Sequence, residues 1–267
     1  MISQNRLRTL ARENKVTVGL MEKDYVNSWI LYVIYNSPLK DRLAFKGGTA
    51  LSKIYFPEIW RFSEDIDLTA KGEINRESFV KILKSEFSNF SEKSGIDFEI
   101  RSTHFKSGYA QIKIQYEAVL GQKNTIRLDI TEDEILSFDF KEKYHSFEDV
   151  PEFKIVVYSL DEIIVEKVRS LFERKRARDF FDVYKLLETV AIENFETIVK
   201  NLKRKMRHKD MDLELDFSES KIEDVESYWD VALDRLISTA EKPEFSETMD
   251  EIEDFLDKIK NKDGDFK

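Results

Sequence analysis

The sequence has no cysteine and little glycine, proline or histidine: 8 Gly, 4 Pro and 3 His among 267 residues. The absence of cysteine excludes disulfides, zinc–thiolate sites and cysteine nucleophiles. The scarcity of glycine and proline argues against long flexible linkers. The three histidines, His104, His145 and His208, lack the spacing of metal ligands, so we interpret them as incidental.

Long hydrophobic runs are also missing. No stretch approaches the ~18 consecutive apolar residues of a membrane-spanning helix, and the first residues are charged, without the apolar centre of a signal peptide. We therefore expect a soluble cytoplasmic protein with no membrane partner. What the chain does have is 41% hydrophobic residues, including 20 Phe, enough for one large domain or two packed domains.

The formal net charge of −10 argues against indiscriminate binding to nucleic acids. The charges are unevenly distributed, however. Basic residues cluster at 167–178 and again at 200–209, whereas the acidic excess lies mostly after residue 210. A polyanion is therefore expected to bind only at a defined surface.

Hydrophobic periodicity predicts two regions of different type. In the first, helices are expected at 22–35, 49–55 and 76–93, and strands at 64–70, 96–103, 109–119, 125–131 and 153–158. In the second, which begins near Ser159, only helices are expected, at 160–173, 177–190, 194–207, 221–240 and 247–260. We predict an α+β fold: a mixed-sheet core flanked by helices over residues 1–155, followed by an all-helical domain over 156–267.

Two aspartates, Asp65 and Asp67, are separated by one apolar residue in the strand expected at 64–70. Because side chains alternate along a strand, both carboxylates should lie on one face, with Cα atoms roughly 6–7 Å apart. Adjacent carboxylates repel unless a cation lies between them, and Mg²⁺ prefers such hard oxygen ligands. The simpler interpretation, a strand with a solvated polar face, is common in so acidic a chain.

Two nearby features favour the metal interpretation. The run Lys46-Gly47-Gly48-Thr49 precedes a predicted helix, where backbone amides can approach an anion and Thr49 can cap the helix or contact a phosphate. An ordinary glycine turn is the alternative. The second feature is Asp129, which lies between apolar residues on a later strand and would complete a two-metal arrangement. Its alternative is a surface salt bridge with Arg127.

These residues resemble the signature of the AbiEii/AbiGii toxin family, the type IV toxin–antitoxin proteins that include MenT-like tRNA nucleotidyltransferases. The resemblance extends from about residue 22 to about residue 190. It is carried by four blocks in the same order: Glu22–Tyr25, Phe45–Lys53, Arg61–Leu68, and Glu166–Val168 with Arg174 and Arg178–Leu186. Many nucleotidyltransferases have Gly-Ser where this chain has Gly48-Thr49, and we expect the retained hydroxyl to keep its phosphate contact.

The resemblance implies a nucleotidyltransferase-like core and a helical domain. It implies transfer of nucleotides from an NTP with Mg²⁺ (or Mn²⁺), an RNA acceptor, in particular the 3′ end of tRNA, and a cognate antitoxin protein as partner. From these residues and the resemblance together, we predict Asp65, Asp67, Asp129, Lys167 and Asp179 as the catalytic residues. The first three would bind the metal, and Lys46, Gly47, Gly48, Thr49, Arg174 and Arg178 would bind the nucleotide.

The C-terminal block allows two geometries. In one continuous helix, Lys167, Arg174, Arg178 and Asp182 would share a face; a turn between Arg174 and Arg178 would instead place Lys167 and Asp179 on facing helices. We expect Lys167 to contact the triphosphate, and Arg174 and Arg178 to hold phosphate or orient carboxylates. Asp179 and Asp182 would fix these cations, or Asp179 would assist proton transfer. A structural salt-bridge network is the alternative.

The leading hypothesis is an enzyme in which Asp65 and Asp67 hold Mg²⁺ and triphosphate while Asp129 polarises the attacking 3′-hydroxyl. Transfer of NMP to a protein hydroxyl, a non-catalytic nucleotide- or partner-binding module, and a metal-dependent nuclease are the alternatives. The basic segment 198–209 is expected to be a solvated helix face, with an RNA backbone track as the other interpretation.

Overall fold

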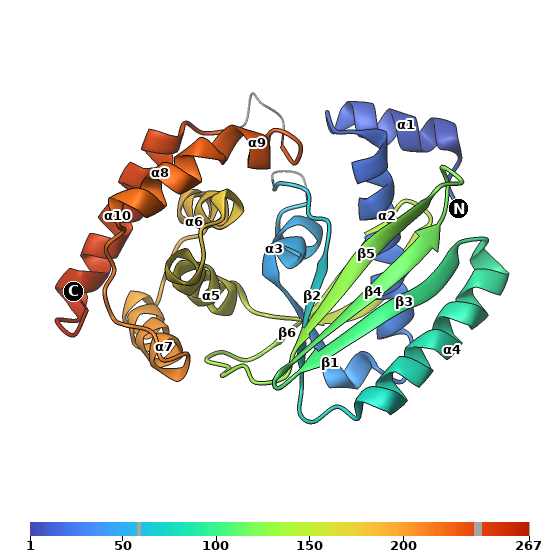
Figure 1. Ribbon diagram of the computed structural model, residues 1–267, viewed down its shortest axis with the longest axis horizontal. Coiled ribbons are helices and arrows are strands. Elements are labelled where there is room, and N and C mark those ends of the chain that lie inside the picture. The colour runs from blue at the N-terminus through green and yellow to red at the C-terminus, as the bar shows by residue number, and fades with distance from the viewer. Residues whose placement is uncertain (58–59, 238–241, 267) are drawn as a thin grey trace. The chain divides into compact units, whose positions relative to one another are not determined.

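The computed structural model describes residues 1–57, 60–237 and 242–266 (Figure 1). It divides into two compact units, which we call the sheet unit (Met1–Glu134 and Phe140–Tyr158) and the helical unit (Ile135–Asp139 and Ser159–Lys267). The boundary predicted at residue 155 assigned residues 135–139 to the first domain, whereas Ile135–Asp139 belongs to the helical unit. This segment joins it through Glu162, whose Oε2 accepts hydrogen bonds from the backbone N–H groups of Ser137 (2.9 Å) and Phe138 (2.8 Å).

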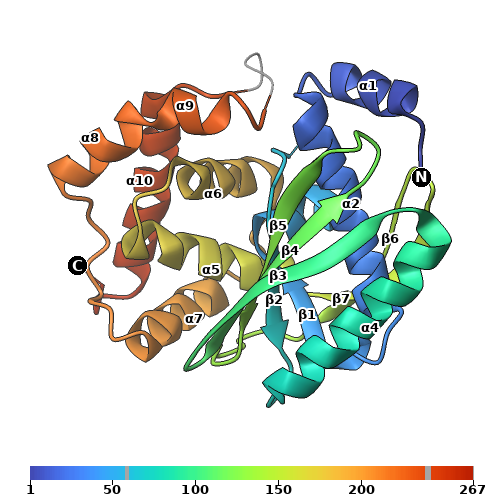
Figure 2. The same cartoon turned by 45° about the vertical axis from the view of Figure 1, so that its right-hand side comes forward.

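The sheet unit is built on a seven-stranded mixed sheet with strand order β3-β4-β5-β2-β1-β7-β6 (Figure 2). The β2–β5 and β1–β7 pairs are parallel, and the other neighbours are antiparallel. The strands are β1 (Leu43–Lys46), β2 (Ile66–Ala70), β3 (Asp97–Lys106), β4 (Tyr109–Glu117), β5 (Lys123–Thr131), β6 (Lys141–Phe147) and β7 (Val150–Val157).

Alternation along the central strands separates an apolar face from a polar face. Ile66 and Leu68 of β2 and Leu128 of β5 are fully buried, and Ile112 of β4 is buried beside them. The residues between them are polar. Burying one such aliphatic side chain contributes about 1.5–3 kcal/mol, so the register that buries them also fixes the polar residues on the opposite face.

The helices of the sheet unit are α1 (Gln4–Glu13), α2 (Val18–Tyr35), the short 3₁₀ helix η1 (Lys40–Arg42), α3 (Gly47–Ala50), the π-helical turn η2 (Leu51–Tyr55) and α4 (Arg76–Ser94). Helix α2 begins after Thr17, whose Oγ1 accepts a hydrogen bond from the Leu20 backbone N–H. Helix α4 packs on the apolar side of β3, where Phe87 stacks on Phe98 at 4.8 Å between ring centroids. Both helices are visible beside the sheet in Figures 1 and 2.

The helical unit contains α5 (Leu160–Glu173), α6 (Ala177–Thr189), α7 (Phe195–His208), α8 (Glu219–Ser227), α9 (Trp229–Leu233) and α10 (Phe245–Lys262). Its core includes Phe180, Leu202 and Ile252. No helix in the described part of the chain is both long enough and apolar enough to span a membrane.

The predicted α+β fold is confirmed, with some differences in its elements. The helix expected at 221–240 is two helices, α8 and α9, and residues 238–240 of that expectation lie outside the described residues. Helix α1 and strands β1 and β6 were not predicted. Strand β1 has only four residues, and β6 is mostly exposed and polar, so neither has a strong hydrophobic period.

Candidate active site

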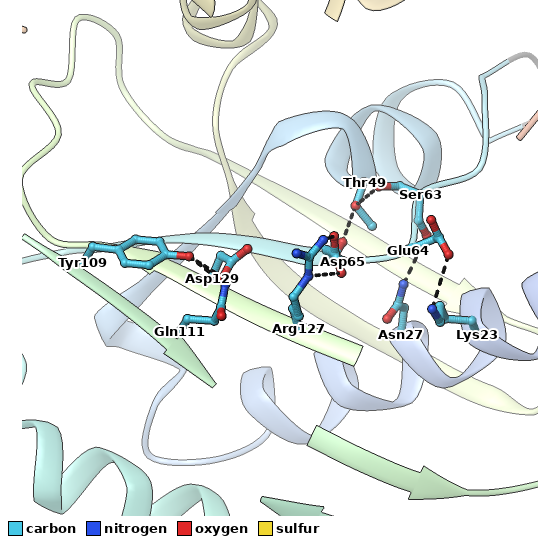
Figure 3. Close-up of polar contacts among 10 residues, drawn as sticks. All are labelled: Lys23, Asn27, Thr49, Ser63, Glu64, Asp65, Tyr109, Gln111, Arg127 and Asp129. Atoms are coloured by element: carbon cyan, nitrogen blue, oxygen red, sulfur yellow. Dashed lines mark hydrogen bonds and ion pairs between the residues drawn. The ribbon is translucent and has the colours of Figure 1, made fainter. Parts of the chain in front are cut away.

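Two of the predicted carboxylates lie side by side on the polar face of the sheet. Strands β2 and β5 run parallel, with Asp67 opposite Asp129 and Ile66 opposite Leu128. Neighbouring strands lie about 4.8 Å apart, so the two aspartates form one pair on one face. Asp65 precedes β2 on the same face, opposite Arg127 (Figure 3).

The third carboxylate, Asp129, is held by β4. Its Oδ1 accepts hydrogen bonds from the Tyr109 hydroxyl (2.6 Å) and from Nε2 of Gln111 (2.9 Å). Burial, together with the neighbouring charges of Asp129 and Asp67, raises the pKa of Tyr109 to about 12, so the phenol stays protonated as a donor. The alternative in which Asp129 pairs with Arg127 is wrong, because Arg127 makes its ion pair with Asp65.

Arg127 covers Asp65 with both arms of its guanidinium. Its Nε donates to Asp65 Oδ1 at 3.0 Å, and its Nη2 donates to Oδ2 (Figure 3). This hydrogen-bonded ion pair, together with the charges of Asp65 and Asp129, raises the pKa of Arg127 further above its usual range. The side chain of Arg127 is 52% exposed, whereas that of Asp65 is 20% exposed.

The glycine turn lies directly against Asp67. Gly47 has a φ of +77°, and a Cβ atom at this position would lie 2.6 Å from Asp67 Oδ2. Only glycine allows both the left-handed backbone and this close approach. Lys46, opposite Asp67 in the β1–β2 register, forms an ion pair of 3.3 Å with Glu134 and lies over the Tyr158 ring.

Thr49 has a different role from the one predicted. Its fully buried hydroxyl donates to the backbone carbonyl of Asp65 at 2.5 Å and lies 2.6 Å from Oγ of Ser63 (Figure 3). It neither caps a helix nor presents its hydroxyl for a phosphate, because the loop before β2 closes over it. Thr49 therefore fixes the backbone of the Asp65–Asp67 segment.

Helix α2 braces the same loop through residues to which the sequence assigned no role. Lys23 Nζ pairs with Glu64 at 3.3 Å, and Asn27 Nδ2 donates to the Ser63 carbonyl at 3.3 Å (Figure 3). Asp24 forms a buried ion pair of 2.8 Å with Lys53, which follows the glycine turn. The family-like block at 22–25 thus anchors both site segments, a role that depends on tertiary contacts.

Close to this brace, His145 is buried with Nε2 3.1 Å from Oγ of Ser28. Ser28 Oγ also accepts from Lys53 Nζ at 2.9 Å. Burial and the charge of Lys53 lower the pKa of His145 to about 3, so the imidazole is neutral.

The predicted three-carboxylate metal site is not assembled among the described residues, where no group of three His, Cys, Asp or Glu lies close enough to hold a metal ion. The physical reason is that Arg127 occupies Asp65. The pair Asp67 and Asp129 still fits the donor set of Mg²⁺, which takes one or two carboxylates and completes its shell with water and substrate phosphates.

The C-terminal block forms a compact ion cluster in the helical unit. Helix α5 ends at Glu173 and α6 begins at Ala177, so the single-helix geometry is wrong and the turn is confirmed. Lys167 Nζ lies 3.1 Å from Asp179 Oδ1 and 2.7 Å from Asp182 Oδ2, and Arg174 Nε lies 2.7 Å from Asp179 Oδ2. Burial alone would raise the pKa of Asp179, but the charges of Lys167 and Arg174 outweigh it and lower the pKa.

Helix α7 carries most of the basic segment 198–209, and Lys200, Arg204 and Arg207 lie exposed as expected for a solvated face, whereas Lys205 does not. Lys205 is 2% exposed and lies 2.5 Å from Glu162 and 3.1 Å from Glu166. Lys203 pairs with Asp263 at 2.9 Å. Acidic residues of the same unit therefore neutralise part of this segment.

Tyr109 and Gln111 are the site residues that the sequence analysis missed. They alternate with apolar residues on β4, as Asp65 and Asp67 do around Ile66, and this alternation was the available signal. The signal does not say which strand lies beside β5. The pairing of β4 with β5, which places Gln111 opposite Asp129, supplies that information.

A mixed sheet with paired aspartates on neighbouring strands, and a glycine turn against one of them, is the arrangement expected of a nucleotidyltransferase. Comparison with known proteins agrees. A family model described as the nucleotidyl transferase AbiEii toxin of type IV TA systems matches residues 29–251. The chain belongs to this family of nucleotidyltransferase toxins, which confirms the resemblance seen in the sequence.

Among solved structures, MenT4, a nucleotidyltransferase toxin from Mycobacterium tuberculosis H37Rv, is similar in fold, with a TM-score of 0.66. The two sequences are 16% identical, and the match covers 99% of this chain and 92% of MenT4. No curated protein matches the sequence.

Proposed function

We propose that this nucleotidyltransferase transfers nucleotides from an NTP to an RNA acceptor, with the 3′ end of tRNA as the expected target, and releases pyrophosphate. The observation that carries the proposal is the Asp67–Asp129 pair, in register on parallel strands with Gly47 against Asp67. Such a pair suits a reaction in which charge on phosphate oxygens must be neutralised and the reactants held in line.

In this proposal Asp67 and Asp129 would hold Mg²⁺ (or Mn²⁺), and Asp65 would be a further ligand if it were not paired with Arg127. The metal would supply charge neutralisation at the phosphates and activation of the attacking hydroxyl. Asp129, which accepts hydrogen bonds from Tyr109 and Gln111, would polarise the acceptor 3′-hydroxyl. Lys46 and the backbone of Gly47 and Gly48 would contact the triphosphate, while Thr49 fixes the loop that carries Asp65.

Four residues of the helical unit are also proposed to act on the substrate: Lys167, Arg174, Arg178 and Asp179. Arg174 is 43% exposed and suits a phosphate contact, and Arg178 is half-buried in the first turn of α6. Lys167 is buried and already contacts two carboxylates, so contact with a phosphate would require the cluster to open. The predicted proton-transfer role of Asp179 would require the same opening.

RNA as the acceptor is supported by the type IV toxin family and by exposed cations on α7, Lys200 and Arg204. Lys203 and Lys205 contribute less to an RNA track, because their charges are balanced by acidic neighbours. Binding through exposed cations would weaken steeply as salt is raised. A cognate antitoxin is the expected protein partner, since the family is described as part of type IV TA systems.

The test is incubation of the purified protein with total tRNA, Mg²⁺ and each α-³²P-labelled NTP in turn. Asp67→Asn is the inactive variant, and Asp97→Asn, an exposed carboxylate on β3 of the same sheet, is the matched control. Label in tRNA with wild type and D97N, but not with D67N, is the expected result. Label in protein would replace RNA with a protein hydroxyl as acceptor, and no label in either pool would contradict the transferase proposal.

A further inference from the structure

The Arg127–Asp65 pair lies within the site and outside the core, since the Arg127 side chain is 52% exposed. Both oxygens of Asp65 are engaged by one guanidinium, in the fork geometry that carboxylates share with phosphates. A carboxylate held in this way has one acceptor site of each oxygen already used, which leaves less of its charge and fewer positions for a metal ion. A cation bound there would also be repelled by the adjacent guanidinium.

The two partners differ in their freedom to move. The backbone of Asp65 is fixed by Thr49, whose hydroxyl donates to its carbonyl at 2.5 Å, and by the start of β2 at Ile66. The backbone of Arg127 lies in β5, and its long side chain is 52% exposed. Release of Asp65 therefore requires movement of the Arg127 side chain.

We propose that Arg127 is a substrate-binding residue that pairs with Asp65 in the nucleotide-free enzyme and moves to the triphosphate when an NTP binds. This inference rests on the proposed function. The planar guanidinium would exchange two carboxylate oxygens for two phosphate oxygens, which it binds with the same geometry. Asp65 is thereby released for the divalent cation when the triphosphate is present.

This exchange couples the two ligands. A triphosphate that removes Arg127 from Asp65 strengthens cation binding, and by thermodynamic reciprocity the cation strengthens triphosphate binding by the same factor. Replacement of Arg127 should consequently have opposite effects on the two ligands measured separately. A simple structural brace would not do this, because its loss would weaken both.

The experiment measures binding without turnover. Mn²⁺ alone is titrated into wild type, Arg127→Gln and Asp65→Asn/Arg127→Gln, with free Mn²⁺ followed by electron paramagnetic resonance. Inorganic tripolyphosphate is titrated separately in EDTA by calorimetry. Arg101→Gln is the matched control, since Arg101 makes an exposed ion pair of 2.9 Å with Glu99 on β3 of the same sheet.

We expect R127Q to bind Mn²⁺ about fivefold more tightly than wild type, the scale of losing one partly exposed ion pair. It should bind tripolyphosphate about tenfold more weakly, because charge-assisted contacts are lost. The double variant should lose the gain in Mn²⁺ affinity, and R101Q should match wild type in both titrations. Arg127→Lys, which keeps the charge without the fork, should fall between wild type and R127Q, and it replaces R127Q if that variant does not fold.

Mn²⁺ affinity that is unchanged or weaker in folded R127Q, or in R127K if R127Q does not fold, would overturn the inference. The inference would also be overturned if the double variant Asp65→Asn/Arg127→Gln still bound Mn²⁺ more tightly than wild type. These outcomes are distinct from failure of the proposed function. Absence of transfer by wild type with every NTP would remove the transferase proposal, whereas transfer by wild type with unchanged Mn²⁺ affinity in R127Q would overturn only the role of Arg127.

Discussion

The sheet unit and the helical unit each gather charged family-signature residues, but they do so in contrasting ways. On the sheet, Asp67 and Asp129 lie half-buried on a polar face, where Asp129 accepts hydrogen bonds from the neutral donors Tyr109 and Gln111. Asp65, beside them, pairs with the partly exposed Arg127. In the helical unit, Lys167, Asp179 and Asp182 are buried and satisfy one another. A partly exposed charge can exchange partners with a ligand, whereas a buried cluster is costly to open.

This contrast predicts that substitutions on the sheet face mainly change activity, whereas substitutions in the helical cluster mainly change stability. Removal of a carboxylate on the sheet face should affect the reaction more than folding, because few buried contacts are lost. Removal of the cation from the helical cluster should affect folding first, because it leaves buried carboxylates without their counter-ion. The predictions below test this separation in order of expected effect.

The largest effect is expected from Asp67→Asn. We expect transfer to fall by about a thousandfold, because charge stabilisation at the phosphates is the largest contribution to such reactions. The free energy of unfolding should stay within about 0.5 kcal/mol of wild type. Rates of labelled-nucleotide transfer and urea denaturation measure the two quantities. Loss of several kcal/mol of stability in D67N would show that Asp67 supports the fold, and would contradict the proposed difference between the sheet face and the helical cluster.

Lys167→Met should lower the free energy of unfolding by about 3 kcal/mol, because Asp179 and Asp182 would remain buried without their cation. Lys185→Met is the matched control in the same unit, since Lys185 pairs with Glu188 in a more exposed position. Urea denaturation compares the two variants. Full stability of K167M with loss of transfer would show that Lys167 acts on the substrate and that its ion pairs with Asp179 and Asp182 are not needed for folding.

Acidification should destabilise the protein through His145, whose pKa is lowered to about 3 by burial and by Lys53. Because the unfolded imidazole titrates near pH 6.5, the unfolded state binds a proton that the folded state does not. Stability is therefore complete above about pH 6.5 and is lost as the pH falls toward 3, by about 2 kcal/mol between pH 8 and pH 5. Urea denaturation at these pH values should show that His145→Gln removes this part of the pH dependence; an unchanged dependence would contradict the assignment.

Gly47→Ala and Gly121→Ala form a matched pair, since both glycines have positive φ, +77° and +65°. Each substitution should cost about 1 kcal/mol of stability for the left-handed backbone. Only G47A also introduces a Cβ atom 2.6 Å from Asp67 Oδ2, whereas a Cβ atom at Gly121 meets no atom within 4 Å. Transfer should fall about tenfold or more in G47A alone, an effect of misplacing one group near the reacting centre. Equal rates would remove the glycine turn from the site.

Much of this architecture follows from local pattern. The alternation at 64–70 predicted the shared face of Asp65 and Asp67, and helices α5, α6 and α7 were expected within a residue or two of their observed ends. The roles of Thr49 and Arg127 did not follow, because they depend on which backbone atoms and which strand lie opposite. The parallel pairing of β2 with β5 joins residues about sixty positions apart, and no local period encodes it.

For a related reason, the sequence did not decide between a turn at 174–176 and one continuous helix. The segment 174–176 contains no glycine or proline, and its charged residues continue the helical spacing of Lys167 and Arg178. The ion pairs of Lys167 and Arg174 with Asp179, which close the turn, are tertiary contacts. Sequence patterns therefore predicted the elements and the polar face, while the partners of each charge required the structure.

The central claim is that this protein transfers a nucleotide and not a terminal phosphate. The most direct measurement uses the accepted NTP labelled either at the α- or at the γ-phosphate, with tRNA and Mg²⁺, and separates RNA from pyrophosphate. The account predicts α-label in the RNA and γ-label in released pyrophosphate, in equal amounts. Transfer of γ-label to RNA or protein, or release of γ-label as orthophosphate without labelled RNA, would contradict it.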